Sequence, residues 1–505
     1  MKRIRNVILG VLIFVLLISL VAPMSSCSQS NSNNNSGVTD NNANVSEAAS
    51  DAPQTTTEFP PPDVPQKDYG GASFNILYPH WGMYTNYFFA ETQTGDAMND
   101  AVYKRNTSVE DQLNLKFNTI EIGDDSDNGI KNILPKVKTS VLAGDGAYDL
   151  VLIHPMCDLG DLIAGQYVMD WNKVPYVDLT KPYWNQSLNS TIAIKNILLF
   201  AASDYIIPDP DAIFFNKGIL ADYNLDDPYA LVKNGQWTWD KLETMAKAVS
   251  KDLNGDGIYD LNDMYGFASI MDGPMIGVMH SCNMYIATKD QNDDPQLYTV
   301  SDKLVNIVNK MYDLIYNGHQ SYCWAYEPDA VKAAALQMDF TKNQVLFEIN
   351  APSDAAQKYR AMDVDFGILP FPKYDEAQTD YISLNNAGLM FIPADCKDVE
   401  RTGIVTELLA AYSRQYTLPA YFDVLLTSKV TRDTESGDML NIIYNNCVYD
   451  FGYNFNGFTN ISYIIPRLMS SKSTNVQSWY DQNAPLAVKT MQTIYDNILK
   501  YQNLN

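Results

Sequence analysis

The sequence predicts a globular α/β protein of more than one domain, on three observations. The chain has 505 residues, and at roughly 100–200 residues per domain this length corresponds to about two to four domains. Hydrophobic residues make up 46% of the chain and aromatic residues 12%, which is enough apolar material for large cores. From about Tyr69 onward, strand-like runs alternate with helix-like stretches, a pattern typical of βαβ units that build a parallel sheet.

Local patterns predict the elements of the first part. β-Branched and aromatic residues indicate a strand at Ser73–Tyr78, and alternation indicates a second at Leu115–Ile122. The continuous apolar run Tyr148–Ile153 is typical of a buried parallel strand. Helices are expected between these strands, around Asn99–Leu113 and Ile130–Ala143.

The second part continues in the same style. Thr238 is expected to cap a helix from Trp239 to about Ser250, and Asp302–Tyr316 has apolar residues at helical spacing on one face. The other expected strands are Ala212–Phe215, Gln344–Ile349, Val364–Leu369 and Gly388–Ile392. The other expected helices are Ala330–Met338, Val399–Tyr416, Met439–Asn446 and Pro485–Tyr501.

The charge balance and the cysteines exclude several classes of protein. There are 60 acidic and 35 basic residues, with a net charge of -25. Nucleic acid requires a basic face, so we expect no nucleic-acid partner. The 6 cysteines form no C-x-x-C pair, which argues against a disulfide or zinc framework. The one long apolar run stands at the start of the chain, so a polytopic membrane protein is excluded.

The N-terminus is typical of an export signal. The basic segment Lys2–Arg5 precedes an apolar stretch from Val7 to Val21, which is shorter than the roughly 20 residues of a membrane-spanning helix. The passage Met24-Ser25-Ser26-Cys27 resembles a bacterial lipobox. We therefore predict a signal peptide at residues 1–26 and lipidation of Cys27. The alternative is an ordinary signal peptide followed by a free cysteine.

A tether is expected after Cys27. Residues 27–68 contain Asn-Ser repeats, a threonine run and three prolines, with almost no apolar residues. Such a segment has little to bury, so we predict that it is disordered. Lipid anchor and tether together predict a protein held at the outer face of the cell membrane.

Four stretches resemble one known family. They are Gly70–Leu77, Ala143–Val151, Phe214–Lys217 followed by Trp237–Asp240, and Gly388–Pro393 followed by a helix that contains Glu407. In this order and spacing the chain resembles the bacterial extracellular solute-binding proteins of the carbohydrate type (family 1). These are the lipid-anchored receptors of ABC importers.

The resemblance implies a two-lobed, periplasmic-binding-protein-like fold of type II, with a hinge and an interlobe ligand cleft. Residues 69–205 and 376–428 would form the first lobe, and residues 206–375 and 429–505 the second. It further implies a carbohydrate ligand, an ABC transporter permease as partner, a monomer and no enzymatic activity. The size of the chain and its supply of aromatic residues favour an oligosaccharide over a monosaccharide. Lobe closure around the ligand would be the signal to the permease.

One local motif fits a twelve-residue calcium loop. Its oxygen ligands, by position, would be Asp252, Asn254, Asp256, the carbonyl of Ile258, Asp260 and Asp263. Gly257 stands at the sixth position, where the chain must turn sharply. Asp263 replaces the usual glutamate at the last position, which would weaken binding. We predict a structural Ca²⁺; the alternative is a metal-free turn rich in Asp and Asn.

Candidate sugar contacts follow from chemistry and position. Aromatic rings stack on the apolar faces of sugars, and polar side chains bind the hydroxyls. His80 and Trp81 follow the first expected strand, His154 follows the third, and Asn350 follows a strand of the second lobe. Strand ends face the cleft in open α/β sheets. A packing aromatic at Trp81 and a core or capping histidine at His154 are the alternatives.

Five further candidates lie in loops or at the expected crossing between lobes. Asp204 and Tyr205 stand at the first crossing, Trp324 and Tyr326 in a loop between two helices, and Tyr453 in an aromatic loop. Other functions remain open. A secreted glycoside hydrolase needs only two suitably spaced carboxylates, and the ligand of a binding protein of this fold could also be a peptide or a polyol.

Overall fold

The computed structural model describes residues 62–81, 87–124, 129–155, 157–327, 332, 335–353, 358–359, 362–385, 388–427, 434–455 and 457–503. They belong to one compact unit that begins at Thr57. The predicted signal peptide, Cys27 and the tether up to residue 61 lie outside the described residues. So do residues 330, 331, 333 and 334 of the helix expected at Ala330–Met338.

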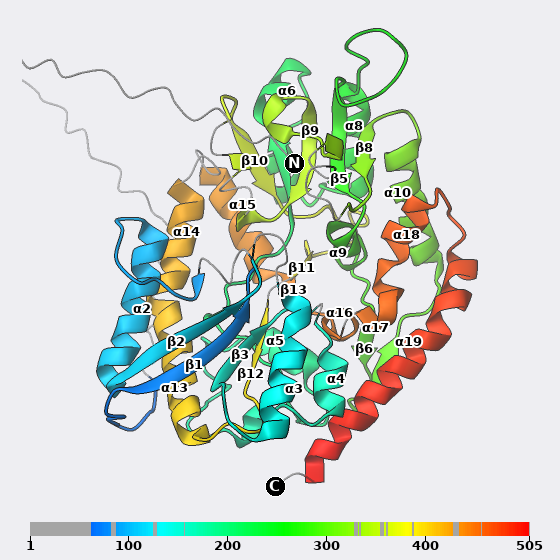
Figure 1. Ribbon diagram of the computed structural model, residues 1–505. Helices are drawn as coiled ribbons and strands as arrows, with labels where there is room; N and C mark the ends of the chain where they lie inside the picture. Colours follow the sequence, from blue (N-terminus) through cyan, green and yellow to red (C-terminus); the bar gives the residue numbers. More distant parts are fainter. Residues whose placement is uncertain are drawn as a thin grey trace, which may run out of the picture. The chain divides into compact units, whose positions relative to one another are not determined.

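The first sheet has four strands in the order β12-β3-β1-β2 (Figure 1). β1 (Ala72–Pro79) pairs parallel with β2 (Leu115–Ile122) and with β3 (Leu150–Ile153), and β12 (Leu389–Phe391) pairs antiparallel with β3. All residues of β3 are buried, as its continuous apolar run predicts. The expected strands of this part are thus confirmed, with ends shifted by up to two residues.

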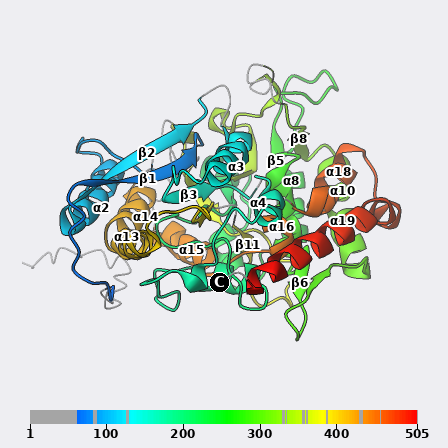
Figure 2. The same cartoon turned by 60° about the horizontal axis from the view of Figure 1, so that its bottom comes forward.

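The helices of this part pack beside the first sheet. They are α2 (Ala97–Leu113), α3 (Ile133–Ala143), α4 (Leu159–Ala164), α5 (Gln186–Ile192), α13 (Val399–Tyr412) and α14 (Leu418–Thr427). α2 packs against α13 and α14 (Figure 2). We expected one helix to end at Tyr416, but a π-helical turn, Ser413–Thr417, joins α13 to α14. The expectation was wrong because no helix-stop residue stands there, and the wider turn lets the chain continue.

The second sheet has five strands in the order β10-β4-β9-β5-β8. The strands are β4 (Ala212–Asn216), β5 (Tyr265–Ile270), β8 (Ser321–Trp324), β9 (Val345–Asn350) and β10 (Phe366–Leu369). β9, β5 and β8 are parallel, whereas β4 runs antiparallel to β9 and β10. The parallel sheet expected from the alternating pattern is therefore found in part, with antiparallel pairs at β4 and β12. β4 and β12 each enter their sheet directly from a crossing segment, and parallel pairing needs a preceding crossover helix.

The helices of the second part confirm most local predictions. They are α6 (Lys217–Asp222), α7 (Pro228–Lys233), α8 (Trp239–Val249), α9 (Gly273–Ser281), α10 (Asp302–Tyr316), α15 (Thr434–Asn445) and α18 (Ile464–Ser470). The Thr238 side chain accepts a hydrogen bond from the Lys241 amide and caps α8. α10 has the predicted ends and buries its apolar face.

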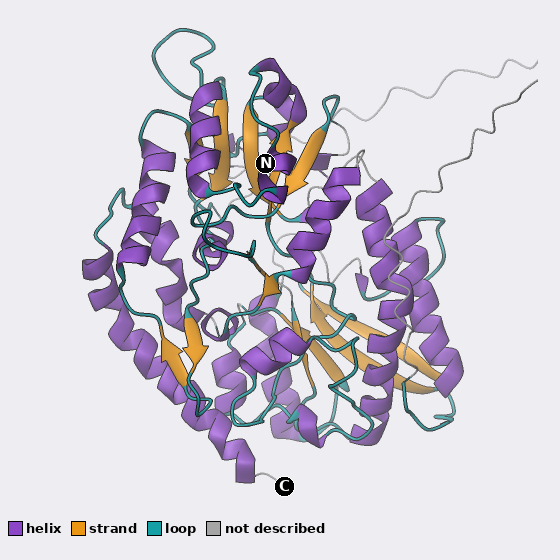
Figure 3. Cartoon of the chain, turned by 180° about the vertical axis from the view of Figure 1, so that it is seen from behind, coloured by secondary structure: helices purple, strands orange, loops and turns teal. Residues whose placement is uncertain are grey.

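Short elements connect the two sheets. β11 (Ser383–Leu384) pairs parallel with β13 (Cys447–Val448), and Figure 3 shows a short strand between the two larger groups of strands. β6 (Ala287–Lys289) and β7 (Pro295–Leu297) form a hairpin, and α16 (Phe451–Asn454) and the turn α17 (Gly457–Asn460) follow β13.

The C-terminal helix α19 runs from Val476 to Leu499. Pro485 lies inside it, so the expectation that a helix begins at Pro485 was wrong. Asn475 caps the helix by accepting from the Ser478 amide, and this local signal outweighed the proline, which removes one helical hydrogen bond. Within the described ranges, no helix is long and apolar enough to cross a membrane.

Four tryptophans are core residues. Trp171, Trp184, Trp237 and Trp239 are at most 1% exposed. The ring nitrogen of Trp184 donates to Glu407 (2.8 Å), that of Trp237 to the Pro370 carbonyl (2.9 Å), and that of Trp239 to Ser281 (3.1 Å). Because these rings are buried and three of them are hydrogen-bonded inside the protein, we look for ligand-stacking aromatics elsewhere.

Candidate ligand-binding site

The carboxyl edge of the first sheet brings together two predicted residues. Trp81 follows β1 and His154 follows β3, and these strands are parallel neighbours. The two rings are stacked, with centroids 4.3 Å apart and planes at 19°. His154 is 6% exposed, whereas Trp81 remains partly exposed. His154 therefore supports one aromatic ring that solvent or a ligand can still reach.

A polar pair stands beside this stack. The His80 Nδ1 atom lies 2.6 Å from Glu121 Oε1, and the His80 amide donates to the Ile122 carbonyl at 2.8 Å. Both side chains are about one-third exposed, at 27% and 33%. Sequence reasoning missed Glu121. The signal was its position near the end of β2, opposite Tyr78 in β1, where it shares the carboxyl edge with His80.

Asp204 and Tyr205 make contacts within the protein. The Arg414 Nε atom donates to Asp204 Oδ2 at 2.5 Å. Burial raises the pKa of Asp204 to about 6, against the opposing effect of Arg414. Tyr205 is 2% exposed, with the Arg105 guanidinium 4.7 Å from its ring centroid and Phe88 at 5.0 Å. The structure thus places Tyr205 in the core and Asp204 in an ion pair.

Sequence reasoning missed a neighbouring cluster around Asp209. The carboxylate of Asp209 accepts from the Ser353 hydroxyl at 2.5 Å and from the Tyr421 hydroxyl at 3.4 Å. The hydroxyls of Tyr421 and Tyr444 are 3.0 Å apart, and Tyr87 packs edge-on against Tyr421. Burial holds the pKa of both Tyr421 and Tyr444 well above the usual range. Asp209 lies in the same crossing segment as Asp204, which was the available signal.

Predicted residues also lie at the carboxyl edge of the second sheet. Trp324 ends β8 opposite Ile270 of β5, so its placement in a loop was wrong, because the segment pairs with the edge of the sheet. Tyr326 follows it and is 64% exposed. Asn350 ends β9; its Nδ2 donates to the Tyr359 hydroxyl at 2.9 Å and its Oδ1 accepts from the Ala351 amide at 2.9 Å.

Glu348 is a buried acid that the sequence did not single out. It lies two residues before Asn350, and its Oε2 accepts from the Tyr359 hydroxyl at 2.5 Å. Burial raises the pKa of Glu348 to about 7. With Asn350 and Tyr359 it lines a cavity of about 380 Å³. No sequence pattern marks it, because β9 otherwise consists of buried apolar residues and a terminal asparagine.

Tyr453 stands in a second polar group. Its amide donates to Asp450 Oδ1 at 3.1 Å, and Asp450 also lies 2.8 Å from the Nε2 atom of the buried His280. Burial, Tyr463 and nearby carboxylates hold the pKa of Tyr453 above its usual range. Asp272, which follows β5, is one of those carboxylates, and burial raises its own pKa.

Comparisons with known proteins identify the fold. No family model and no curated protein matches the chain. A galacto-N-biose/lacto-N-biose I-binding protein of the ABC transporter from Bifidobacterium longum, in complex with lacto-N-biose, matches with a TM-score of 0.54 at 12% identity, over 86% of this chain and 99% of its own. An ABC substrate-binding protein from Listeria monocytogenes, in complex with cycloalternan, matches with a TM-score of 0.52 at 11% identity, over 86% of this chain and 100% of its own. A solute-binding protein from Thermotoga lettingae, bound with alpha-D-tagatose, matches with a TM-score of 0.52 at 14% identity, over 84% of this chain and 100% of its own.

The chain has the two-lobed fold of ABC-transporter solute-binding proteins. Its two larger sheets supply the carboxyl edges at which open α/β folds bind ligands. Trp81 and His154 stand at one edge, and Trp324, Asn350 and Asp272 at the other.

The crossing between the two sheets of this solute-binding fold is held by the side-chain amides of two asparagines. The Tyr449 hydroxyl accepts from Asn185 Nδ2 at 2.6 Å and also from Asn385 Nδ2. The Asn385 Oδ1 atom accepts from the Asp209 amide at 3.2 Å. Asn385 is fully buried, so these bonds fix the position of Asp209 relative to β13.

The predicted calcium loop lies between α8 and β5. Asp252 accepts from the amides of Gly255 (2.6 Å) and Gly257 (2.8 Å), and Asp263 accepts from those of Leu253 (2.9 Å) and Asp260 (2.8 Å). Gly257 has a φ of 78°, as a sharp turn requires. Among the described residues, no three Asp, Glu, His or Cys side chains are grouped to hold a metal ion. The turn alone accounts for these bonds, so calcium stays a prediction.

Proposed function

We propose that this protein captures a carbohydrate between its two lobes outside the cell and delivers it to the permease of an ABC transporter. The observation that favours this function most is the Trp81–His154 stack at the carboxyl edge of the first sheet. It occurs in a fold whose matches are described as bound with lacto-N-biose, cycloalternan and tagatose.

The chemistry of the edge suits a sugar. A partly exposed indole offers a flat apolar surface for a sugar ring, and the neighbouring His80–Glu121 pair offers donors and acceptors for hydroxyls. At the other edge, Asn350 and Trp324 would contact the ligand when the lobes close, with Tyr453, Tyr326 and Asp204 as further predicted contacts. Tyr205 was also a predicted contact, but at 2% exposed it lies in the core. An oligosaccharide would engage more of these groups than a single ring.

Three further proposals complete the function. Lipidated Cys27 would anchor a monomer to the outer face of the membrane, with residues 28–68 as the tether. The lobes would comprise residues 69–205 with 376–428 and residues 206–375 with 429–505. Ca²⁺ would bind the loop Asp252–Asp263 and stabilise the connection between α8 and β5. The support for it is that four carboxylates and one amide stand at the ligand positions of the twelve-residue loop.

A thermal-shift screen tests the proposed function. A ligand that binds only the folded state raises the melting temperature. We expect one glycan from a panel of mono- and oligosaccharides to raise the melting temperature of the wild type, with no release of smaller sugars during overnight incubation. The Trp81→Ala protein should lose the shift. Trp479→Ala, which removes another partly exposed indole on α19, is the matched control and should keep it.

Two other outcomes would contradict the proposed function. Release of smaller sugars would indicate a glycoside hydrolase and not a binding protein. A shift with a peptide or a polyol, and with no sugar, would overturn the ligand class and leave the fold in place.

A further inference from the structure

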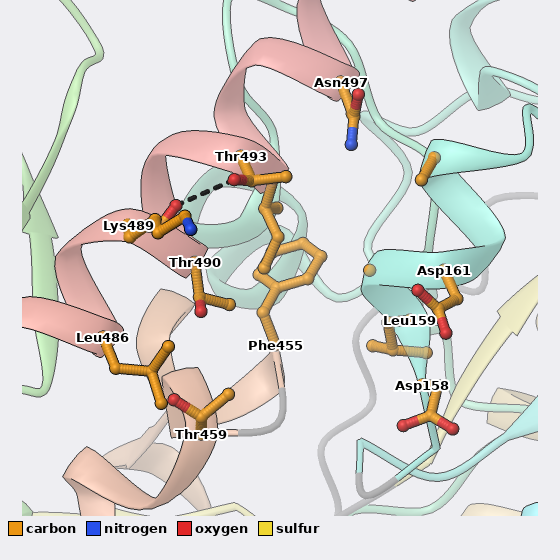
Figure 4. A pocket seen from close by; sticks show the side chains of 13 residues that line it. Asp158, Leu159, Asp161, Phe455, Thr459, Leu486, Lys489, Thr490, Thr493 and Asn497 are labelled. Atoms are coloured by element: carbon orange, nitrogen blue, oxygen red, sulfur yellow. Dashed lines mark hydrogen bonds between the residues drawn. The ribbon is translucent and has the colours of Figure 1, made fainter. Parts of the chain in front are cut away.

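A separate cavity lies between α4 and α19. It measures about 310 Å³, at the lower end of the range for small-molecule pockets. α4 supplies one wall, and α19 with the turn Gly457–Asn460 supplies the other (Figure 4). Phe455, Leu159 and Ile494 give it an apolar lining, and all three are buried. None of the predicted sugar contacts lines it.

The polar groups of the cavity stand on opposite walls. Asp158 and Asp161 lie on the α4 side, and Thr490, Lys489 and Asn497 on the α19 side. Within the described part of the chain, neither carboxylate has a hydrogen-bond donor or an ion-pair partner. Two acceptors therefore face a set of groups that can donate.

Asn497 is the most informative of these groups. It is 8% exposed, and its Oδ1 accepts from Lys500 Nζ at 2.6 Å. In Figure 4 its amide nitrogen points toward the cavity, and it has no acceptor among the described residues. The Asn497 amide nitrogen is not one of the fully buried atoms without a partner, so solvent in the cavity reaches it. A ligand that displaces this solvent must supply an acceptor, because a buried amide N–H without one costs free energy.

We propose that this cavity is a second ligand site, which takes a single-ring polyhydroxylated molecule such as a monosaccharide. A simple cation would leave the Asn497 amide without an acceptor, and an anion would face Asp158 and Asp161. A hydroxylated ring meets both demands, because each hydroxyl donates to a carboxylate or accepts from Asn497. Its apolar face would pack on Phe455 and Ile494.

The position of the site predicts a local effect on α19. The hydroxyl of Tyr480 donates to the Tyr298 carbonyl (2.6 Å) before Pro485, and that of Tyr501 donates to the Ile163 carbonyl (3.3 Å) at the far end. The part of α19 after Pro485 lines the cavity. Because Pro485 has no N–H to donate to the Asp481 carbonyl, the turn just before this part lacks one backbone hydrogen bond. A bound ring would fasten this part to α4, so amide exchange across Leu486–Asn497 should slow.

The test uses methyl NMR of the Trp81→Ala protein titrated with D-glucose, D-galactose and D-xylose. The Trp81→Ala background separates this site from the proposed cleft. We expect at least one sugar to shift the methyl signals of Thr490 and Ile494, with slower amide exchange in the same segment. Adding Asp161→Asn should weaken binding roughly tenfold, the effect of one charge-assisted hydrogen bond.

Asp496→Asn is the matched control, because Asp496 is an exposed carboxylate of α19 that does not line the cavity. It should bind the sugar with unchanged affinity. No shift with any of the three sugars, or equal affinities of the Asp161→Asn and Asp496→Asn proteins, would overturn the proposal. Neither result would affect the thermal-shift test of the interlobe site, which uses the wild type.

Discussion

Replacing Glu348 by glutamine should stabilise the protein in a pH-dependent manner. Glu348 is 4% exposed, and burial raises its pKa from 4.5 to about 7. A carboxyl whose pKa is higher in the folded state contributes its full stability below the unfolded-state pKa, and that contribution is lost as the pH rises through 7. At 1.36 kcal/mol per unit, the loss above pH 7 is about 3 kcal/mol.

Glutamine is neutral at every pH and keeps an oxygen that can accept from the Tyr359 hydroxyl. The free energy of unfolding of Glu348→Gln should therefore exceed that of the wild type by about 3 kcal/mol at pH 8.5 and by about 1 kcal/mol at pH 5. Urea unfolding at the two pH values measures both differences. Glu376→Gln alters an exposed carboxylate and should change stability by less than about 0.5 kcal/mol. Equal stability of Glu348→Gln and wild type at pH 8.5 would refute the reasoning.

Three other predictions test the packing and the metal loop. Arg414→Met removes the ion-pair partner of Asp204 and should lower the free energy of unfolding by about 2 kcal/mol at pH 8. The loss should be smaller at pH 5, because Asp204, with a pKa of about 6, is mostly protonated there. Equal losses at both pH values in urea unfolding would contradict this prediction. Glu407→Leu leaves the buried donors of Tyr183 and Trp184 unpaired and should lower the free energy of unfolding by roughly 3–5 kcal/mol. Glu407→Gln, which keeps an acceptor, should lower it clearly less. Similar losses for the two variants would show that these hydrogen bonds do not stabilise the protein. Calcium should raise the melting temperature of the wild type and not that of Asp256→Ala, with a chelator reversing the effect; no effect of calcium on the wild type would remove the metal proposal.

Local structure could be predicted where the signal lies within one segment. β3 consists of a continuous apolar run and is buried, α10 has its apolar residues at helical spacing, and Thr238 caps α8 as expected. Each of these depends on residues within a few positions. Strand direction does not depend on nearby residues alone. β4 and β12 run antiparallel to their neighbours because of where the chain crosses between the sheets.

The candidate site shows the same limit. Trp81 and His154 were each predicted from a position after a strand, but their stacking depends on β1 and β3 being neighbours in the sheet. Glu121, Asp209 and Glu348 were missed, because an acid in an exposed loop and an acid in a buried site look alike in a chain with 60 of them. Only the contacts with His80, Tyr421 and Tyr359 distinguish these three.

The central claim, capture of a carbohydrate at the edge that holds Trp81, is tested most directly by titration calorimetry. The glycan that raises the melting temperature would be titrated into the wild type, Trp81→Ala and the Trp479→Ala control. We predict one saturable interlobe site in the wild type, at least tenfold weaker binding by Trp81→Ala, and unchanged binding by Trp479→Ala. Equal affinities of the wild type and Trp81→Ala, or no binding heat from any glycan, would contradict the account.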